Sequence, residues 1–379
     1  MRIALVSSCA VSVPPRAYGG TELVVAELAK NLTRLGHDVT TFATGDSTPE
    51  GGTLQWRFEK PVWPPYESAE LRHAAHAWQA ITSAPSAFDI VHTHQAPSLA
   101  FASLAPSVRT VYTIHHCRDE RLIDLYRDFP NATYVGISKR QAELIPEIPV
   151  EEIILHGLDP DLYEAGHGGG GYVAFLGRFA PEKGPHFAID AARLAGVTVR
   201  MGGGVHPPDR PFFEREVRPR LEDGTGGVEW LGELSHTPKL SLLRGARAML
   251  FPIDWEEPFG LVMIESMLVG TPVIGFPHGS VAEVIEEGVT GFVVRDVAEM
   301  AARIRQLDTF DRARCRERAR ERWSSLRMAR EHEALYERIL TRSLRGRLQS
   351  GVHDLNRAPQ RLSSEGRRTE ASPVGRRPL

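Results

Sequence analysis

The sequence of 379 residues has only three cysteines, Cys9, Cys117 and Cys315, which lie far apart and show no C-x-x-C spacing. An odd, scattered set of this kind argues against a disulfide framework and against a zinc site, and it fits a reducing cytosol. The sequence also lacks an apolar run long enough for a signal-peptide core or a membrane-spanning helix. We therefore expect a cytoplasmic protein.

An excess of charge of one sign is missing as well. The formal net charge is −3 and the pI is about 6.6, which gives no overall attraction to nucleic acid or to a membrane. We expect no nucleic-acid partner. Peripheral membrane contact is left open, without a basic amphipathic helix in the N-terminal half to support it. The hydrophobic fraction of 42% is typical of a soluble globular protein, and the length predicts two domains.

The first half of the sequence alternates strand and helix patterns. RIALVSS is a buried-strand run, and the segment TELVVAELAKNLTRLG that follows is a helix, with Thr21 placed to cap its start and Gly36 at its end. Later strand patterns end in polar residues: FDIVHTHQ, RTVYTIHH and TYVGISK. Alternation of this kind predicts an α/β fold with a parallel sheet, which binds ligands beyond the carboxyl ends of its strands.

The second half repeats the pattern after a glycine-rich segment. AGHGGGG, residues 165–171, suits a linker or a long surface loop. Strand patterns then restart with YVAFLGR, VTVRMGGG and RAMLFPI. We therefore expect two doubly wound, Rossmann-like domains facing each other across a cleft, 1–165 and 166–322, with a helix at about 323–341 crossing back. Residues 345–379 have no aromatic residue and no isoleucine, so they are predicted to be a disordered basic tail.

The stretch DWEEPFGLVMIESM, residues 254–267, carries two carboxylates. Glu257 precedes a proline and so belongs to a loop, while the helix pattern starts near Gly260. The start of that helix offers free N–H groups that suit a phosphate. Glu265 lies about one turn further on, where its carboxylate could accept hydrogen bonds from the diol of a ribose. Because the helix has almost no polar face, Glu265 is predicted to be buried and to need a partner.

Cations and glycines elsewhere suit the same ligand. Arg178 and Lys183 follow a predicted strand and could converge on a diphosphate. Gly19 and Gly20 allow close approach of the backbone to a ligand. The pattern is neither G-x-G-x-x-G nor a G-x-x-x-x-G-K-[ST] phosphate loop, which weakens a dehydrogenase or P-loop reading.

No metal site is expected. Asp159-Pro160-Asp161 spells D-x-D but lies just before the glycine-rich segment, where we interpret it as structural. The histidines at 92, 94, 115 and 116 have no carboxylate or cysteine at ligand spacing beside them.

These motifs resemble a known family. GRFAPEKG, the E-x7-E block within FPIDWEEPFGLVMIESMLVGTPVIGF, GGTE, YTIHH and VGISK are similar to the family 4 glycosyltransferases of the GT-B fold, over about residues 1–340. The E-x7-E block is the specific part, whereas GGTE and VGISK are weak alone. The resemblance implies transfer of a sugar from a nucleotide-sugar donor to an acceptor, with retention at the anomeric carbon and without a metal or other cofactor. The acceptor stays unknown, whether a sugar, a lipid-linked sugar or a small molecule.

The resemblance also implies roles for single residues. Arg178 and Lys183 would stabilise the leaving diphosphate, Glu265 would bind the ribose, and Glu257 would contact the donor sugar. His115 would touch the sugar from the N-terminal domain. Backbone groups that would help to hold the donor belong to Gly20, Phe259, Gly260 and Leu261.

The sequence departs from the family pattern in two places. His156-Gly157-Leu158-Asp159 stands for Asn-Gly-Val-Asp, which puts the geometry of domain closure in doubt. His278-Gly279 and Ala282-Glu283 stand for Gly-Gly and Pro-Glu, which puts the sugar contacts in doubt. Two alternatives remain: a nucleotide-sugar 2-epimerase on the same fold, and a non-catalytic nucleotide-sugar binding protein.

Overall fold

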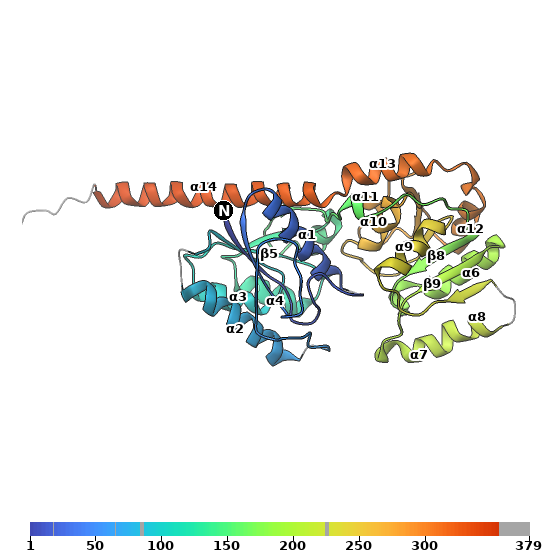
Figure 1. Cartoon of the computed structure of the whole chain (residues 1–379), viewed down its shortest axis with the longest axis horizontal. Coiled ribbons are helices and arrows are strands. Elements are labelled where there is room, and N and C mark those ends of the chain that lie inside the picture. Colours follow the sequence, from blue (N-terminus) through green and yellow to red (C-terminus); the bar gives the residue numbers. More distant parts are fainter. Residues whose placement is uncertain (18, 65, 84–86, 224–226, 356–379) are drawn as a thin grey trace, which may run out of the picture. The chain divides into compact units, whose positions relative to one another are not determined.

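The computed structural model describes residues 1–355 except residues 18, 65, 84–86 and 224–226 (Figure 1). Residues Met1–Glu337 form one compact unit, and every contact discussed below lies within it. Arg338–Leu379 form a second unit, of which the structure describes the helical residues up to Leu355.

The first half builds a sheet of seven parallel strands in the order β3-β2-β1-β4-β5-β6-β7. Its strands are β1 (Arg2–Val6), β2 (Asp38–Ala43), β3 (Thr53–Trp56), β4 (Ile90–Thr93), β5 (Thr110–Thr113), β6 (Thr133–Gly136) and β7 (Val150–Ile153). Its helices are α1 (Gly20–Arg34), α2 (Glu67–Ser83), α3 (Pro97–Leu104), α4 (Glu120–Asp128) and α5 (Lys139–Leu144). The inner strand β1 pairs with β2 and with β4, and Val6 stands opposite Phe42 and Thr93.

The second half builds a sheet of six parallel strands in the order β10-β9-β8-β11-β12-β13. Its strands are β8 (Tyr172–Leu176), β9 (Thr198–Gly202), β10 (Val228–Trp230), β11 (Met249–Phe251), β12 (Val273–Gly275) and β13 (Gly291–Val293). Its helices are α6 (Pro185–Ala195), α7 (Arg210–Phe212), α8 (Arg218–Glu222), α9 (His236–Gly245), α10 (Leu261–Leu268), α11 (Val281–Val284), α12 (Val297–Arg305) and α13 (Arg312–Arg322). Helix α14 (Ser325–Leu355) follows.

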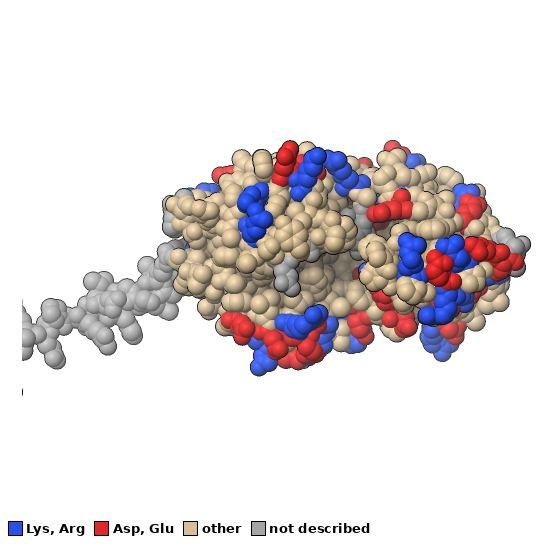
Figure 2. All heavy atoms as spheres, turned by 90° about the horizontal axis from the view of Figure 1, so that it is seen from below, with Lys and Arg blue, Asp and Glu red and all other residues tan. Residues whose placement is uncertain are grey.

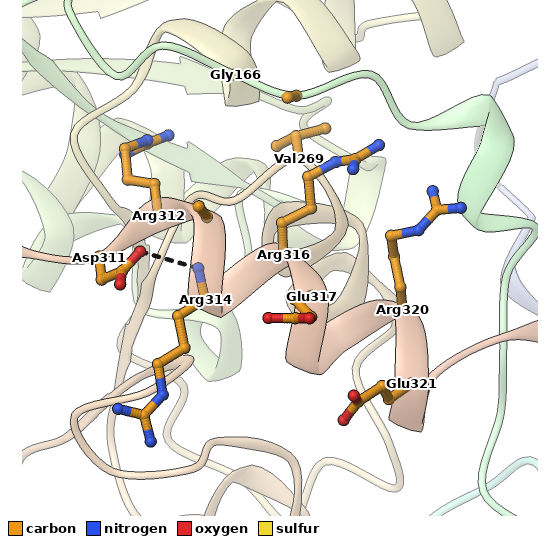
Figure 3. A pocket seen from close by; sticks show the side chains of 11 residues that line it. Gly166, Val269, Asp311, Arg312, Arg314, Arg316, Glu317, Arg320 and Glu321 are labelled. Atoms are coloured by element: carbon orange, nitrogen blue, oxygen red, sulfur yellow. Dashed lines mark hydrogen bonds between the residues drawn. The ribbon is translucent and has the colours of Figure 1, made fainter.

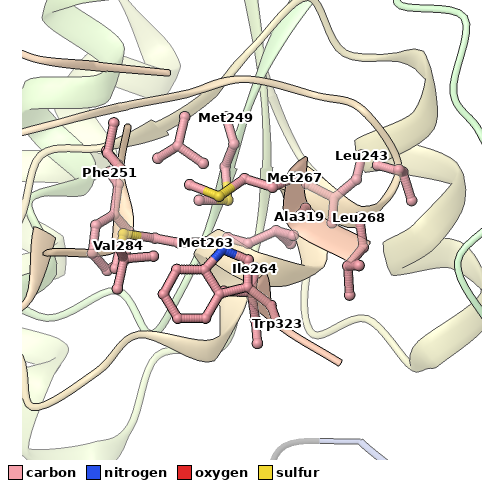
Figure 4. Close-up of a cluster of buried hydrophobic side chains, with 14 of the residues drawn as sticks. Leu243, Met249, Phe251, Met263, Ile264, Met267, Leu268, Val284, Ala319 and Trp323 are labelled. Atoms are coloured by element: carbon pink, nitrogen blue, oxygen red, sulfur yellow. The ribbon is translucent and has the colours of Figure 1, made fainter. Parts of the chain in front are cut away.

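Successive side chains of the strands in the second sheet point to opposite faces and pack in two separate hydrophobic cores. Met249 of β11 packs with α10 and α13, in a cluster that also holds Met263 and Trp323 (Figure 4). The next residue, Leu250, packs on the opposite face with α6 and α12. Both faces of the sheet are therefore covered, as expected for parallel strands that read as continuous apolar runs. Helix α10 is buried from Met263 to Leu268 and lies in the first of these cores.

The chain passes between the two sheets twice, and the two passages pair with each other. Leu158 donates from its backbone N–H to the carbonyl of Trp323, and Ser325 donates to the carbonyl of Leu158, at 2.9 Å each. A β-carbon on Gly157 would lie 2.4 Å from the carbonyl oxygen of Ser324. Glycine is therefore required at this position, which keeps the second residue of the family's Asn-Gly-Val-Asp pattern although His156 replaces the first.

Three local expectations need correction or refinement. Helix α1 begins at Gly20 after Gly19 and has no side-chain cap, so the predicted capping role of Thr21 is wrong. The glycine-rich segment is a docked loop and not a free linker, because Gly166, Gly168 and Gly170 donate backbone hydrogen bonds to carbonyls of the second domain.

The sequence predicts a disordered tail from residue 345, whereas the structure continues α14 to Leu355. Residues 325–355 contain no proline, which is compatible with that helix. The remainder of the tail, residues 356–379, lies outside the described residues.

The surface charge is mixed. On the face seen in Figure 2, basic and acidic side chains lie next to each other and form no single basic field. None of the helices in the part of the chain that the structure describes is long and apolar enough to cross a membrane.

Candidate active site

Helix α10 starts directly after the loop that carries Glu257, at the carboxyl end of β11 (Met249–Phe251). Gly260 precedes the helix with φ +78°, and a β-carbon there would lie 2.8 Å from the methyl group of Met263. The turn into the helix therefore requires glycine, and it leaves the first N–H groups of α10 without helical partners. This confirms the predicted loop-to-helix transition. The anion site predicted at this helix start stays a prediction.

Glu257 is held by a cation and by an indole. Its carboxylate accepts hydrogen bonds from the Lys183 ammonium and from Nε1 of Trp255, the latter at 3.0 Å. The Lys183 ammonium lies 4.4 Å from the centroid of the Trp255 ring. Ser280 donates from its backbone to the Glu257 carbonyl, and a β-carbon on Gly279 would lie 2.3 Å from backbone atoms of Glu257. His278-Gly279 stands for the family's Gly-Gly, and Gly279, the glycine that the structure requires here, is the one that is retained.

Glu265 is only 4% exposed and confirms the prediction of a buried acid with a partner. Its carboxylate forms an ion pair with Lys239 of α9 and accepts a hydrogen bond from the hydroxyl of Tyr163 at 3.4 Å. The sequence reading named neither partner. The one available signal for Lys239 was that a buried carboxylate needs a cation nearby, and this signal does not say which lysine or arginine supplies it.

Arg178 and Lys183 belong to the loop after β8, which includes a short 3-10 turn, Pro181–Lys183. Gly184 has φ +66°, and a β-carbon there would lie 2.0 Å from the carbonyl oxygen of Pro252, so this loop lies tightly against the residue after β11. That packing brings Lys183 to Glu257. Arg178 instead pairs with Glu182 of its own loop and, at 3.3 Å, with Asp209.

The first domain contributes His115, which follows β5. Its Nε2 lies 2.9 Å from Nδ1 of His94, and its ring stacks on His156 at 5.4 Å between centroids. Burial lowers the pKa of His115 to about 3, with a smaller effect of the neighbouring His116 and His332. The imidazole is therefore neutral at pH 7. His156 in turn meets the ring of Phe259 edge-on at 5.0 Å, which links His115 to the loop before α10.

Gly20 also reaches this region, because a β-carbon on it would lie 3.4 Å from Cδ1 of Leu261. The structure thus places Lys183, Glu257, Phe259, Gly260 and Leu261 in one contiguous region, with Gly20 at the edge.

His115 reaches this region only through His156, a residue that the sequence reading did not assign to the site. Arg178 shares the loop of Lys183, and Glu265 lies on the helix that begins at Leu261. In the described part of the chain, their hydrogen bonds and ion pairs go to residues outside this region. Trp255, which touches both Lys183 and Glu257, was also missed, although it stands inside the quoted motif.

The loop before α10 is also tied to the first domain. Arg140 of α5 forms a bidentate pair with Glu256, with distances of 2.9 and 2.7 Å. Glu283 accepts hydrogen bonds from the backbone N–H groups of Lys139 and Arg140, at the start of α5. A carboxylate at a helix N-terminus is favourable, so Glu283, which retains the glutamate of the family's Pro-Glu position, stabilises this contact.

Within the described ranges, no group of three or more histidine, cysteine, aspartate or glutamate side chains is arranged to hold a metal ion.

Two family models match the chain. The model described as Glycosyltransferase Family 4 matches residues 18–146, and the model described as Glycosyl transferases group 1 matches residues 166–322. The D-inositol 3-phosphate glycosyltransferases of Mycobacterium bovis and Mycobacterium tuberculosis are 29% identical over 251 residues, which is 55% of this chain and 51% of each relative. The chain thus spans about half the length of these relatives.

Solved structures resemble nearly the whole described fold. AviGT4, a glycosyltransferase involved in avilamycin A biosynthesis, has a TM-score of 0.69 at 25% identity, over 90% of this chain and 98% of that one. Sucrose-phosphate synthase from Thermosynechococcus elongatus has a TM-score of 0.73 at 19% identity, over 90% and 100%. Anabaena Alr3699/HepE, solved with UDP and glucose, has a TM-score of 0.69 at 20% identity, over 89% and 99%.

The two parallel sheets with their covering helices therefore form the GT-B fold, and the chain resembles glycosyltransferases in both of its halves. It belongs to family 4 of the glycosyltransferases.

Proposed function

We propose that this enzyme transfers a sugar from a nucleotide-sugar to the hydroxyl group of a small acceptor, with retention at the anomeric carbon and without a metal ion. The observation that carries the proposal is the arrangement around α10. The helix N-terminus lies beside the contact between Lys183 and Glu257, and Glu265 stands one turn further along the same helix. This spacing suits a sugar, a diphosphate and a ribose bound in that order.

The leaving diphosphate would be stabilised by cations and by backbone dipoles. Lys183 offers a point charge, Arg178 a guanidinium fork, and the first turn of α10 its free N–H groups. Charge develops on the diphosphate as the bond to the sugar breaks, so groups aimed at it lower the barrier to the reaction. Relatives and neighbours support the donor class, since one neighbour is solved with UDP and glucose.

The sugar would become oxocarbenium-like in the transition state. Glu257 is placed to hold its hydroxyl groups, and neutral His115 offers a hydrogen bond from the first domain. We assign no separate base. The departing phosphate oxygen accepts the proton of the acceptor hydroxyl on the same face of the sugar, which retains the anomeric configuration.

For the acceptor we propose a polyhydroxylated small molecule. The matched relatives are named for D-inositol 3-phosphate, a compound of this class, although the alignment spans about half of their length. The proposal is limited to the class, and a sugar satisfies it as well as a cyclic polyol.

The test begins with calorimetric binding of UDP, GDP, ADP and TDP to the full chain and to Glu265→Ala. We expect one of the four nucleotides to bind. If the Glu265 carboxylate accepts hydrogen bonds from the ribose, the affinity of that nucleotide should fall by about tenfold or more in the variant. The matching sugar nucleotide is then incubated with candidate polyols in EDTA, and NMR reads the anomer formed. Inverted product, loss of activity in EDTA, or an epimeric sugar nucleotide formed without acceptor would each contradict a part of the proposal.

A further inference from the structure

A cavity of about 1150 Å³ lies between helix α13 and the start of the glycine-rich loop, and the proposed reaction does not use it (Figure 3). Ala165, Gly166 and Val269 line one side, and α13 lines the other. Val269 follows the last residue of α10, so the cavity lies at the end of α10 opposite to the donor site.

Three arginines of α13 gather on the cavity side. Arg312, Arg316 and Arg320 are four residues apart and therefore share one face of the helix. Figure 3 shows them extending toward Gly166 and Val269, while Arg314 and Glu321 extend the other way. Gly168 makes room for this arrangement, because a β-carbon on it would lie 2.7 Å from Nη1 of Arg312.

These guanidinium groups are only partly satisfied. Arg312 donates to the carbonyl of Arg247 and to the hydroxyl of Thr271, and Arg316 donates to the carbonyl of Tyr163 at 3.0 Å. Among the described residues neither Arg312 nor Arg316 has a carboxylate partner, and Nε of each is buried without an acceptor.

Arg320 differs, because it pairs with the exposed Asp161. Burial lowers the pKa of Arg312 and of Arg316, so the surroundings disfavour the charge that these groups carry.

A structural role alone does not account for this set. Arg316 and Arg320 fasten residues 160–163 to α13, but a guanidinium has five N–H donors and these bonds use one or two of each. Three carboxylates also line the cavity. Asp311 caps α13 through the backbone of Arg314, Glu321 pairs with Arg318, and Glu317 is exposed.

We propose that this cavity binds a small molecule carrying a phosphate group, held by Arg312, Arg316 and Arg320. The forked donors of a guanidinium match phosphate oxygens, and a phosphate supplies the negative charge that no ion pair gives Arg312 or Arg316 among the described residues. The volume exceeds what inorganic phosphate needs and leaves space for an organic part, as in ordinary ligand pockets.

The cavity is connected to the donor site through one residue. The carbonyl of Tyr163 accepts from Arg316, and the hydroxyl of the same residue donates to Glu265. An anion that draws Arg316 away from the Tyr163 carbonyl therefore changes the position of Tyr163 and with it the hydrogen bond from its hydroxyl to Glu265. We infer that the ligand acts as an effector of nucleotide binding; this second step rests on the proposed function, and the first does not.

Binding is tested by calorimetry on the full chain with glucose 6-phosphate, inorganic phosphate and sulfate, at constant ionic strength. The Lys183→Ala background weakens binding of these anions at the donor site, where Lys183 is one of the proposed phosphate-binding groups. We expect one molecule of glucose 6-phosphate per chain in that background, weakened about tenfold or more by Arg316→Gln. Arg305→Gln is expected to leave it unchanged, because it removes the same charge from an exposed position outside the cavity.

Several results would overturn the site. They are an absence of binding at millimolar concentration, equal weakening by the two glutamine variants, or loss of binding in the Lys183→Ala background alone. If Arg316→Gln lowers the melting temperature, Arg316→Lys is used, which keeps the charge but loses the fork and is expected to weaken binding by a smaller factor. Tighter binding of inorganic phosphate than of glucose 6-phosphate would identify the phosphate ion itself as the ligand.

The effector step is tested separately. Saturating glucose 6-phosphate is expected to change the Kd of the bound nucleotide by about threefold or more in the wild type, within the usual range of coupling energies, and to leave it unchanged in Tyr163→Phe. An unchanged Kd in the wild type would reject the coupling while leaving the phosphate site in place.

Discussion

Lys183 and Glu257 are in direct contact, across the two loops that follow β8 and β11. One is the cation proposed for the leaving diphosphate and the other is the acid proposed for the donor sugar. The pair neutralises both groups within the protein, and Trp255 covers both through a hydrogen bond and its ring face. Donor binding would replace this contact by one contact of each group to the ligand.

Replacing Lys183 by alanine removes a cation from the leaving group and the counter-charge from Glu257. We expect turnover to fall by about a hundredfold or more, as for other losses of transition-state charge stabilisation. Steady-state kinetics with the sugar nucleotide is the measurement, and Lys60→Ala, at an exposed position, is the control. Equal activity of the two variants would remove Lys183 from the site.

Arg178 is predicted to act through its fork. Arg178→Ala is expected to lower turnover by at least about a hundredfold, and Arg178→Lys to recover only a part, because an ammonium cannot bind two phosphate oxygens in the same way. Full activity of the lysine variant would mean that charge alone suffices. Near-normal turnover of the alanine variant would contradict the assignment of Arg178.

A double mutant separates the structural and functional parts of Glu265. Glu265→Gln leaves the Lys239 ammonium largely buried without its partner, so we expect about 2–3 kcal/mol of lost stability together with weaker nucleotide binding. Glu265→Gln with Lys239→Met should regain stability in urea unfolding but not the affinity. Recovery of both would show that Glu265 affects the nucleotide only through folding.

The sequence predicted the local parts of this site well. Pro258 and Gly260 predict the loop and the helix start, and the apolar run of α10 predicts that Glu265 is buried. Both predictions were possible because each depends on residues within a few positions of each other. The same holds for the strand and helix alternation that defines the two domains.

What the sequence could not supply were partners far along the chain. Lys239 meets Glu265 only because α9 packs against α10, and His156 reaches Phe259 only once the passage at Gly157 is paired with Ser324. The cavity beside the arginines of α13 could not be predicted for the same reason. Their spacing is visible in the sequence, but the opposite wall of the cavity is formed by residues 165, 166 and 269, which are far along the chain.

His94 is expected to act as a positioning residue for His115. Because Nδ1 of His94 bonds to Nε2 of His115, His94→Phe frees the His115 ring to turn. We expect turnover to fall by about tenfold to a hundredfold while the Kd of the free nucleotide stays within about twofold, since the nucleotide is proposed to bind the other domain. A parallel loss of nucleotide affinity would indicate a general structural defect instead.

Buried histidines make stability dependent on pH. Burial lowers the pKa of His73 and of His332 to about 4 and that of His115 to about 3, whereas unfolded histidine titrates near about 6.5. Between these values the unfolded chain binds protons that the folded chain does not. Stability is therefore unaffected above about pH 6.5 and is lost as the pH falls toward about 4, by up to about 1.4 kcal/mol per unit for each histidine.

Buried Glu22 and Glu27, whose pKa values are raised by desolvation, act in the opposite direction, so single variants are needed to see the histidine contribution. His332 is suitable because its Nε2 has no hydrogen-bond partner among the described residues and its ring packs against His92. In urea unfolding from pH 7.5 to pH 5, His332→Phe should lose less stability than the wild type, with the difference growing by about 1 kcal/mol per unit below about pH 6.5. Parallel pH profiles of the two proteins would mean that His332 is protonated in the folded chain or stays neutral in both states.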